Sequence, residues 1–378
     1  MDKRRVCARC VMDTTAADIV FDEQGICNYC RAFDARLQHA DPQGAATQAR
    51  REQFIATVKA NGQGHDYDCV VGVSGGVDSS YVLYLAVQFG LRPLAVHLDN
   101  GWNSELATHN IANLVSRLHV DLYTHVVDWQ ENRDLQRSFF AANVVDIELL
   151  MDNAMYALNY QQAAARGIRW ILAGTNLATE GMAMPPGWNH YKFDVRNIRG
   201  IQQRFGSTPI KTHPLMSTLD FVWYQYVRRI QWVSFLDYVS YDKFAALEIL
   251  QRECDYKPYP YKHYESVFTR FYQGYILPRK FGYDKRRTHL AALVVTGQMT
   301  RDTALQMLEQ SPYPDAALEQ QDRVFVMKKL GFSEQEFDAY MRAPAVPHAV
   351  YGSEEPLYRT FLKINDVLKS ARGSQNGR

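Results

Sequence analysis

One short stretch of the chain combines the residue types that bind phosphate. It reads Ser74-Gly75-Gly76-Val77-Asp78-Ser79-Ser80, with an apolar run over residues 70–73 before it and another over 81–87 after it. The pattern predicts a buried strand, a glycine turn and a helix N-terminus, where free backbone N–H groups and the helix dipole attract an anion. The glycines let the backbone approach a phosphate closely, the serine hydroxyls add donors, and Asp78 can hold a cation that bridges phosphate oxygens. A purely structural turn is the alternative interpretation.

Four cysteines have the spacing of a metal site. Cys7-Ala8-Arg9-Cys10 and Cys27-Asn28-Tyr29-Cys30 give the pattern Cys-x2-Cys-x16-Cys-x2-Cys. Two such pairs predict one tetrahedral zinc ion, whereas a single pair could also be a redox dithiol. Four thiolates leave no open coordination position, so the expected role of the zinc is structural or in docking.

Polar residues also follow two further predicted strands. The strands cover residues 93–98 and 169–173, and Asp99-Asn100 and Gly174-Thr175-Asn176 come directly after them. A third strand over residues 121–127 and a long helix over 146–166 complete an alternating α/β pattern. Because parallel strands bind ligands beyond their carboxyl ends, these polar residues should lie beside the serine-glycine loop along one edge of a sheet.

The pattern as a whole predicts an α/β fold with a doubly wound parallel sheet. A zinc-ribbon-like module should occupy residues 1–45, the α/β domain residues 46–240, and a helical substrate or partner region residues 241–378. The net charge of the 378-residue chain is +1, which argues against a protein that binds mainly nucleic acid. No long apolar run or signal peptide is recognisable, so we expect a cytoplasmic protein without a membrane span.

Two other segments are candidates for binding a substrate. Residues 182–206 read as a long loop above the sheet edge, in which Lys192 and Asp194 could meet a charged substrate. Residues 256–287 are dense in tyrosine, lysine and arginine, which suits either a groove for single-stranded RNA or a pocket for a sugar nucleotide. Helices that simply pack through their tyrosines remain a third interpretation.

The serine-glycine loop resembles that of the PP-loop ATP pyrophosphatases, which cleave ATP to AMP and pyrophosphate. The resemblance extends to Gly174-Thr175-Asn176 with the downstream Glu180. It implies that Asp78 and Glu180 hold magnesium, while Asp99 and Thr175 border the nucleotide. The residues expected to bind ATP are Ser74, Gly75, Gly76, Asp78, Ser79, Ser80, Asp99, Gly174 and Thr175.

Most of the chain resembles the N-acetyl sugar amidotransferases, PP-loop enzymes of bacterial surface-polysaccharide and nonulosonic acid pathways, including lipopolysaccharide O-antigen. Besides the cysteines and the loop, the resemblance rests on the segments 97–103, 262–266 and 283–287. It implies conversion of an acetamido group of a nucleotide-linked sugar to an acetamidino group, with ATP, Mg²⁺ and ammonia. We expect Ser74, Asp78 and Lys192 to take part in catalysis. The alternatives are a tRNA-modifying PP-loop enzyme, of the thiolation or lysidine type, and a noncatalytic zinc-dependent docking protein.

The source of the ammonia is expected to be another protein. Outside the zinc pattern only Cys69 and Cys254 remain, and neither lies in surroundings that would activate a nucleophilic cysteine. The family resemblance implies a separate glutaminase subunit and a cyclase-like, ammonia-conducting subunit, both of the histidine-biosynthesis type. Either the zinc module or the C-terminal helices could supply the docking surface.

Overall fold

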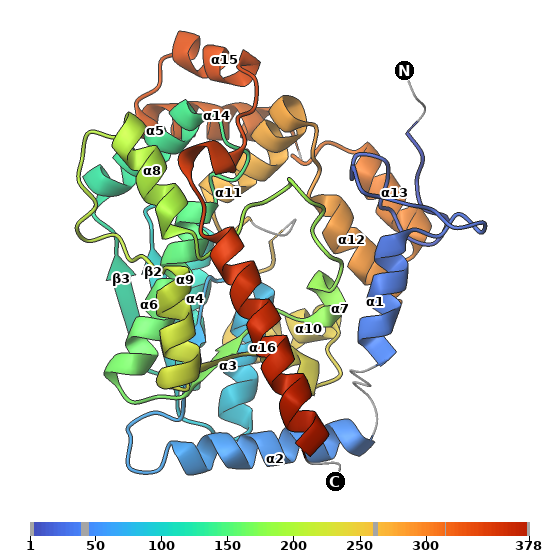
Figure 1. The fold of residues 1–378 in the computed structure, drawn as a ribbon, viewed down its shortest axis with the longest axis vertical. Coiled ribbons are helices and arrows are strands. Elements are labelled where there is room, and N and C mark those ends of the chain that lie inside the picture. Colours follow the sequence, from blue (N-terminus) through green and yellow to red (C-terminus); the bar gives the residue numbers. More distant parts are fainter. Residues whose placement is uncertain (1–3, 39–44, 260–263, 314, 376–378) are drawn as a thin grey trace.

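The computed structural model describes residues 4–38, 45–259, 264–313 and 315–375, and its core is a parallel five-stranded sheet (Figure 1). The strand order is β3-β2-β1-β4-β5, and all four pairings are parallel. Lys262 and His263, which belong to the family resemblance, and residues 39–44 at the first predicted domain boundary lie outside the described residues. The strands are β1 (Cys69–Gly72), β2 (Pro93–Asp99), β3 (Leu122–Val126), β4 (Trp170–Ala173) and β5 (Gln231–Ser234).

Helices cover both faces of the sheet because successive strand residues point to opposite sides. Val71 belongs to a core with α3 (Val77–Gln88), α4 (Glu105–Leu118) and α10 (Lys243–Cys254). Its neighbour Val70 belongs to a second core on the other face, with α6 (Leu149–Ala165). The predicted doubly wound parallel architecture is therefore confirmed.

The strand order reverses between β1 and β4. From β1 the chain continues to β2 and β3 on one side, and it then returns to β4 and β5 on the other side. Such a switch point leaves a crevice beyond the carboxyl ends of the two central strands, which is where open α/β sheets bind ligands. The residues that follow β1 and β4 are the serine-glycine loop and Gly174-Thr175.

The C-terminal part is helical, as predicted, and two further hydrophobic cores join it to the rest of the chain. One joins α5 to α11, η3, α14 and α15, and the other joins the cysteine module to α12 and α13. The corresponding groups of helices lie at the top and right of Figure 1. The remaining elements are α1 (Asn28–Gln38), α2 (Ala45–Asn61), α5 (Trp129–Ala142), α7 (Leu177–Glu180), α8 (Val195–Phe205), α9 (Thr218–Val222), η1 (Trp223–Val227), η2 (Phe235–Tyr238), α11 (Val267–Phe271), η3 (Tyr272–Phe281), α12 (Arg286–Val295), α13 (Arg301–Glu309), α14 (Ala316–Leu330), α15 (Glu334–Arg342), η4 (His348–Tyr351) and α16 (Glu355–Gln375).

Two elements differ from the sequence prediction. Part of the segment 182–206, predicted as a loop, forms α8, whose buried stripe of Val195, Ile198 and Ile201 is diluted by polar residues and by Gly200. A β-carbon on Gly200 would lie 2.1 Å from the Tyr351 carbonyl oxygen, so this glycine permits close packing inside the helix. The sequence also did not reveal β5, a four-residue edge strand that is only half-buried throughout.

Within the described parts of the chain, no helix combines the length and the apolar character needed to cross a membrane.

Candidate active site

The loop between β1 and α3 presents an uncapped helix N-terminus. Gly76 is the N-cap of α3, and no side chain caps the helix there, so its first N–H groups face the crevice. Gly75 has a φ of +84°, and a β-carbon on it would meet the Ala107 backbone at 3.1–3.2 Å. The hydroxyls of Tyr256 and Tyr259 donate to the Gly75 carbonyl at 2.8 and 3.1 Å. The glycine is therefore both required by the turn and held in place from the C-terminal part of the chain.

The serine hydroxyls of the loop divide into two groups. Ser74 and Ser79 lie 3.2 Å apart, oxygen to oxygen, and both line the crevice. The Gly76 N–H donates to the Ser74 hydroxyl at 3.3 Å. Ser80 differs, because its side chain is fully buried among the described residues, lines neither cavity and has no hydrogen-bond partner there. Of the three serines, two are thus placed to contact a phosphate.

Two cavities meet at this loop. The larger, of about 680 Å³, lies between the carboxyl ends of β1, β2 and β4 and the N-terminal half of α6. The smaller, of about 470 Å³, lies between the loop and the C-terminal elements α10, η3 and α12. Both are lined by Ser74, Ser79, Gly174, Thr175 and Glu180, so the predicted residues form the boundary between two connected chambers.

Three carboxylates surround the loop. Asp78 and Glu180 line the smaller cavity and both raise the pKa of the Tyr241 phenol, which burial already raises. Tyr241 consequently stays protonated and donates a hydrogen bond to Asp78. Glu265 lines both cavities, and a β-carbon on Gly76 would lie 3.5 Å from one of its carboxylate oxygens. Carboxylates beside a helix N-terminus suit a divalent cation, which would neutralise both the carboxylates and a bound anion.

Gly174 and Thr175 lie where the sequence predicted, against the start of α3. A β-carbon on Gly174 would lie 2.8 Å from the Ser79 nitrogen and 2.9 Å from the Asp78 carbonyl carbon. The Thr175 hydroxyl lies 2.9 Å from the hydroxyl of Ser234, the last residue of β5. The close approach of the end of β4 to the start of α3 is thus possible only with glycine at position 174.

Asp99 is not placed as predicted. Its carboxylate accepts hydrogen bonds from the Gly101 N–H at 2.9 Å and from the Asn103 amide at 3.5 Å, and it lines neither cavity. Its neighbours His97 and Asn100 line the larger cavity instead. The sequence identified the correct strand end, but the side chain of Asp99 stabilises the turn that follows it.

Lys192 reaches the larger cavity and is held between two carboxylates. Its ammonium nitrogen lies 2.6 Å from Asp146 and 2.7 Å from Asp152. Burial alone would lower the pKa of Lys192, but the two carboxylates outweigh it and raise that pKa above its usual value. Burial raises the pKa of Asp152, an effect that Lys192 partly offsets. Lys192 is therefore a fixed positive charge rather than a base.

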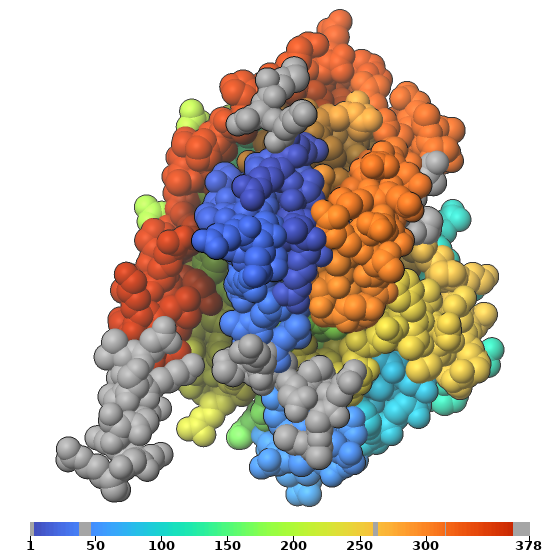
Figure 2. All heavy atoms as spheres, turned by 90° about the vertical axis from the view of Figure 1, so that its right-hand side faces the viewer, coloured from blue at the N-terminus to red at the C-terminus, as the bar shows by residue number. Residues whose placement is uncertain are grey.

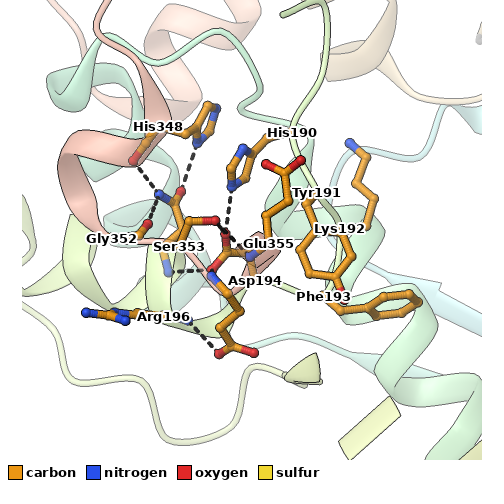
Figure 3. Close-up of polar contacts among 12 residues, drawn as sticks. His190, Tyr191, Lys192, Phe193, Asp194, Arg196, His348, Gly352, Ser353 and Glu355 are labelled. Atoms are coloured by element: carbon orange, nitrogen blue, oxygen red, sulfur yellow. Dashed lines mark hydrogen bonds and ion pairs between the residues drawn. The ribbon is translucent and has the colours of Figure 1, made fainter. Parts of the chain in front are cut away.

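Asp194, the other polar residue predicted to meet a substrate, is fully buried and has a structural role. It caps α8 by accepting from the Asn197 N–H, and it also bonds His190 and Ser353 (Figure 3). Its surroundings leave no oxygen facing the cavity.

The C-terminal elements contribute cavity residues that the sequence did not single out. Glu148, at the start of α6, accepts from Gln273 at 2.9 and 3.1 Å and from Lys285 at 2.9 Å. Arg270 in α11 lines the smaller cavity and binds Asp322 with two bonds of 2.6 Å. Lys285 and Arg270 belong to the tyrosine-rich basic segment 256–287. The composition of this segment predicted a substrate-binding region but not which of its residues line the cavity.

The four cysteines form a compact, buried group. All four sulfurs lie within 4.8 Å of one another, with Cys7–Cys30 at 4.0 Å and Cys10–Cys27 at 3.7 Å. A tetrahedral zinc site with Zn–S bonds of about 2.3 Å has sulfur–sulfur edges of about 3.8 Å. The donor set and its spacing therefore fit zinc.

The cysteine module packs beside α12 and α13, as Figure 2 shows for the blue and orange segments. Arg301 donates to the carbonyls of Cys7 and Cys10 at 2.8 and 3.1 Å, and Arg287 donates to the Val11 carbonyl at 2.7 Å. Because α12 also lines the smaller cavity, the module supports one wall of the site.

The C-terminal part of the chain matches a known family. Residues 265–365 match the model of the C-terminal domain of WbpG-like lipopolysaccharide (LPS) biosynthesis proteins. This match agrees with the lipopolysaccharide part of the resemblance noted from the sequence, and the matched residues include Glu265, Arg270, Lys285 and His289 of the cavity walls. No curated protein matches the chain.

Two solved structures show a weaker similarity. One is NMN synthetase from Francisella tularensis, at 16% identity, covering 57% of this chain and 99% of that chain, with a TM-score of 0.29. The other is the NH3-dependent NAD synthetase from Campylobacter jejuni subsp. jejuni NCTC 11168 in complex with the nitrate ion, at 16% identity, covering 43% and 79%, also with a TM-score of 0.29.

Proposed function

We propose that this protein, whose C-terminal part is WbpG-like, is an ATP-dependent N-acetyl sugar amidotransferase of surface-polysaccharide biosynthesis. The observation that carries the proposal is the uncapped Ser74–Ser79 loop at the sheet's switch point, set between two joined cavities. The strand ends line the larger cavity, and residues of the part of the chain that matches the LPS family contribute to the walls of both cavities. This arrangement suits a reaction that brings ATP and a second substrate together at a phosphate.

The chemistry requires activation of an amide. An amide oxygen is a poor leaving group, so nitrogen cannot replace it directly. Attack of the acetamido oxygen on the α-phosphorus of ATP breaks the bond to pyrophosphate and gives an adenylylated imidate. Ammonia then adds to the imidate carbon and AMP leaves, which produces the acetamidino group. The protein must stabilise the charge on the departing pyrophosphate and exclude water from the imidate.

The loop residues have the roles that this chemistry needs. The N-terminus of α3, with the hydroxyls of Ser74 and Ser79, would hold the phosphates. Asp78 and Glu180, with Glu265 nearby, would hold Mg²⁺, which supplies charge neutralisation for the leaving group. Lys192, kept positive by Asp146 and Asp152, would offset negative charge at the far side of the larger cavity.

The smaller cavity is the proposed place for the sugar substrate. Its walls carry Lys243, Arg270 and Arg286 together with the aromatic rings of Tyr259 and Tyr264. Cationic side chains suit the diphosphate of a sugar nucleotide, and aromatic rings suit sugar faces. The two cavities share the phosphate loop, so an acetamido group in one can reach a nucleotide in the other.

Ammonia would come from a separate glutaminase, as expected from the sequence. Cys69 is fully buried in β1, and burial raises its pKa above the usual thiol value. Cys254 is also buried at the end of α10, where burial raises its pKa to about 11. Neither thiol is a ready nucleophile at neutral pH. A glutaminase with a cyclase-like, ammonia-conducting subunit would therefore dock on this chain.

The nitrogen source and the substrate class can be tested together. The isolated chain is incubated with ATP, Mg²⁺ and a panel of N-acetylated sugar nucleotides, with either ammonium chloride or glutamine. We expect pyrophosphate release with ammonium and none with glutamine alone. Efficient use of glutamine by the single chain would contradict the ammonia assignment. Pyrophosphate release that depends on tRNA and not on sugars would contradict the sugar assignment.

A further inference from the structure

A buried histidine far along the chain contacts the residue that holds Lys192. The ring nitrogen Nε2 of His348 accepts a hydrogen bond of 3.1 Å from the N–H of Asp146. Asp146 in turn binds the Lys192 ammonium at 2.6 Å and the His190 N–H at 2.7 Å, both through Oδ2. A series of hydrogen bonds therefore connects His348 in η4, through Asp146 just before α6, to the Lys192 ammonium in the larger cavity.

The hydrogen bonds of His348 fix its protonation state. Asn197 uses its amide nitrogen to donate to the carbonyls of His348 and Gly352, at 2.7 and 2.8 Å. Its amide oxygen must then accept the proton on His348 Nδ1, at 2.8 Å. With Nδ1 donating and Nε2 accepting, His348 is a neutral imidazole. Burial, followed by the neighbouring His190, lowers the pKa of His348 to about 3, in agreement with this assignment.

The segment 190–194, which carries Lys192, is clamped at both ends (Figure 3). The His190 ring stacks on His348 with centroids 4.2 Å apart and an angle of 5° between the planes. Its Nε2 lies 2.7 Å from Asp194. Asp194 is held from the C-terminal segment by the Ser353 hydroxyl at 2.5 Å and the Glu354 N–H at 2.9 Å. Lys192 lies between these two anchor points.

We propose that His348 is a positioning residue that fixes Lys192 in the larger cavity through Asp146 and His190. Residues of η4 and of the segment that leads into α16 thereby set the position of the Lys192 ammonium. This inference deepens the proposed function, because it relies on Lys192 acting on the nucleotide. The claim that His348 positions Lys192 does not depend on that function, and the tests below separate the positioning role from the proposed activity.

The kinetic test is a double-mutant cycle. His348→Phe keeps a ring for stacking on His190 but removes both nitrogens. We expect it to lower kcat for pyrophosphate release by about 10- to 100-fold, with KM for ATP little changed, since small misplacement of a catalytic group has effects of this size. In a Lys192→Met background, adding His348→Phe should cause no further loss. Losses that multiply in the double variant would overturn the proposal.

Two companion variants control for folding. Tyr340→Phe removes another buried polar atom from an aromatic ring outside this cluster, one that has no hydrogen-bond partner among the described residues, and it should leave kcat unchanged. His348→Gln can still accept from the Asp146 N–H and should recover part of the activity. A His348→Gln variant no more active than His348→Phe, although folded, would count against positioning through Asp146.

A chemical measurement tests the geometry without any turnover. The protein is treated with an amine-acylating reagent, and acylation of Lys192 is compared with that of exposed Lys211 by peptide mass spectrometry. We expect Lys192 to react slowly in the wild type and several-fold faster in His348→Phe, because acylation requires an accessible, neutral amine. Equal rates in both proteins would overturn the inference. If the wild type turns over no sugar substrate, the proposed function fails, while this comparison still decides the positioning role.

Discussion

Single residues decide how closely the end of β4 and the serine-glycine loop approach each other at the crevice. Gly174 allows the end of β4 to touch the start of α3, and Gly75 supplies the left-handed turn that exposes the helix N-terminus. Asp78 adds the charge at this point, with Tyr241 fixing one of its oxygens. The serine-glycine loop is therefore defined by two backbone constraints and one carboxylate.

Asp78→Asn should separate the charge of this carboxylate from its shape. Asparagine has nearly the same size and can still accept from the Tyr241 hydroxyl, so the fold should survive. We expect pyrophosphate release to fall by about 100-fold or more because a metal-binding charge is lost. The measurements are steady-state activity across a Mg²⁺ titration and the thermal midpoint of unfolding.

Asp302→Asn, at an exposed position on α13, is the matched control and should leave both the activity and the thermal midpoint unchanged. Near-normal activity of a folded Asp78→Asn protein would exclude the magnesium role.

At the scale of elements, the cysteine module packs against helix α12, which lines the smaller cavity. Small modules of this kind have little core of their own and depend on their metal to fold. Here the carbonyls of Cys7, Cys10 and Val11 receive hydrogen bonds from Arg301 and Arg287, the latter on the cavity helix α12. Loss of the module's fold should therefore be felt at the smaller cavity.

Freshly purified protein should contain one zinc ion per chain, measured by elemental analysis. Cys27→Ser should lower both the zinc content and the yield of soluble protein, since three thiolates cannot complete the site. Cys254→Ser changes a buried cysteine outside the module and serves as the control, with zinc content unchanged. Protein that is fully folded and active without any zinc would rule out this structural role.

At the scale of the whole molecule, two buried histidines make stability depend on pH. Burial lowers the pKa of His213 to about 4 and that of His348 to about 3, from an ordinary value of 6.5. Below about pH 6.5 the unfolded chain takes up protons that the folded chain does not. Stability contributed by these neutral rings is thus fully present above pH 6.5 and is lost as the pH falls toward the folded-state values.

As the pH falls below 6.5, the free energy of unfolding should decrease with a slope that approaches about 1.4 kcal/mol per pH unit for each of these histidines. Urea titrations between pH 7 and 5 measure the slope. His348→Phe should remove up to one proton from this slope, whereas Tyr340→Phe, which changes no group that titrates between pH 5 and 7, should leave the slope unchanged. A slope that is the same for His348→Phe and the wild type would show that His348 does not enter the fold as a neutral ring.

The extent of sequence-based prediction also varied across the molecule. Mostly apolar runs such as 70–73 predicted β1, β2 and β4, because a buried parallel strand must be apolar nearly throughout. The prediction of β3 has another basis, since β3 is an edge strand of alternating exposed and half-buried residues. β5 was missed because its residues are half-buried and mixed in character, and α8 because Gly200 and polar residues interrupt its stripe. Local spacing indicated that Ser74, Ser79 and Gly174 lie together, and in the structure all three line both cavities, whereas their role in binding ATP stays a prediction. It could not show that Asp99 turns away or that His348 approaches Asp146, since these depend on tertiary packing.

The identity of the products tests the central claim most directly. The chain is incubated with ATP, Mg²⁺, ¹⁵N-labelled ammonium and an N-acetylated sugar nucleotide, and the products are analysed by mass spectrometry. The account predicts AMP and pyrophosphate in equal amounts to a sugar product in which one oxygen is replaced by a labelled N–H group. ADP and phosphate as the nucleotide products, or AMP formation with no label in the sugar, would contradict it.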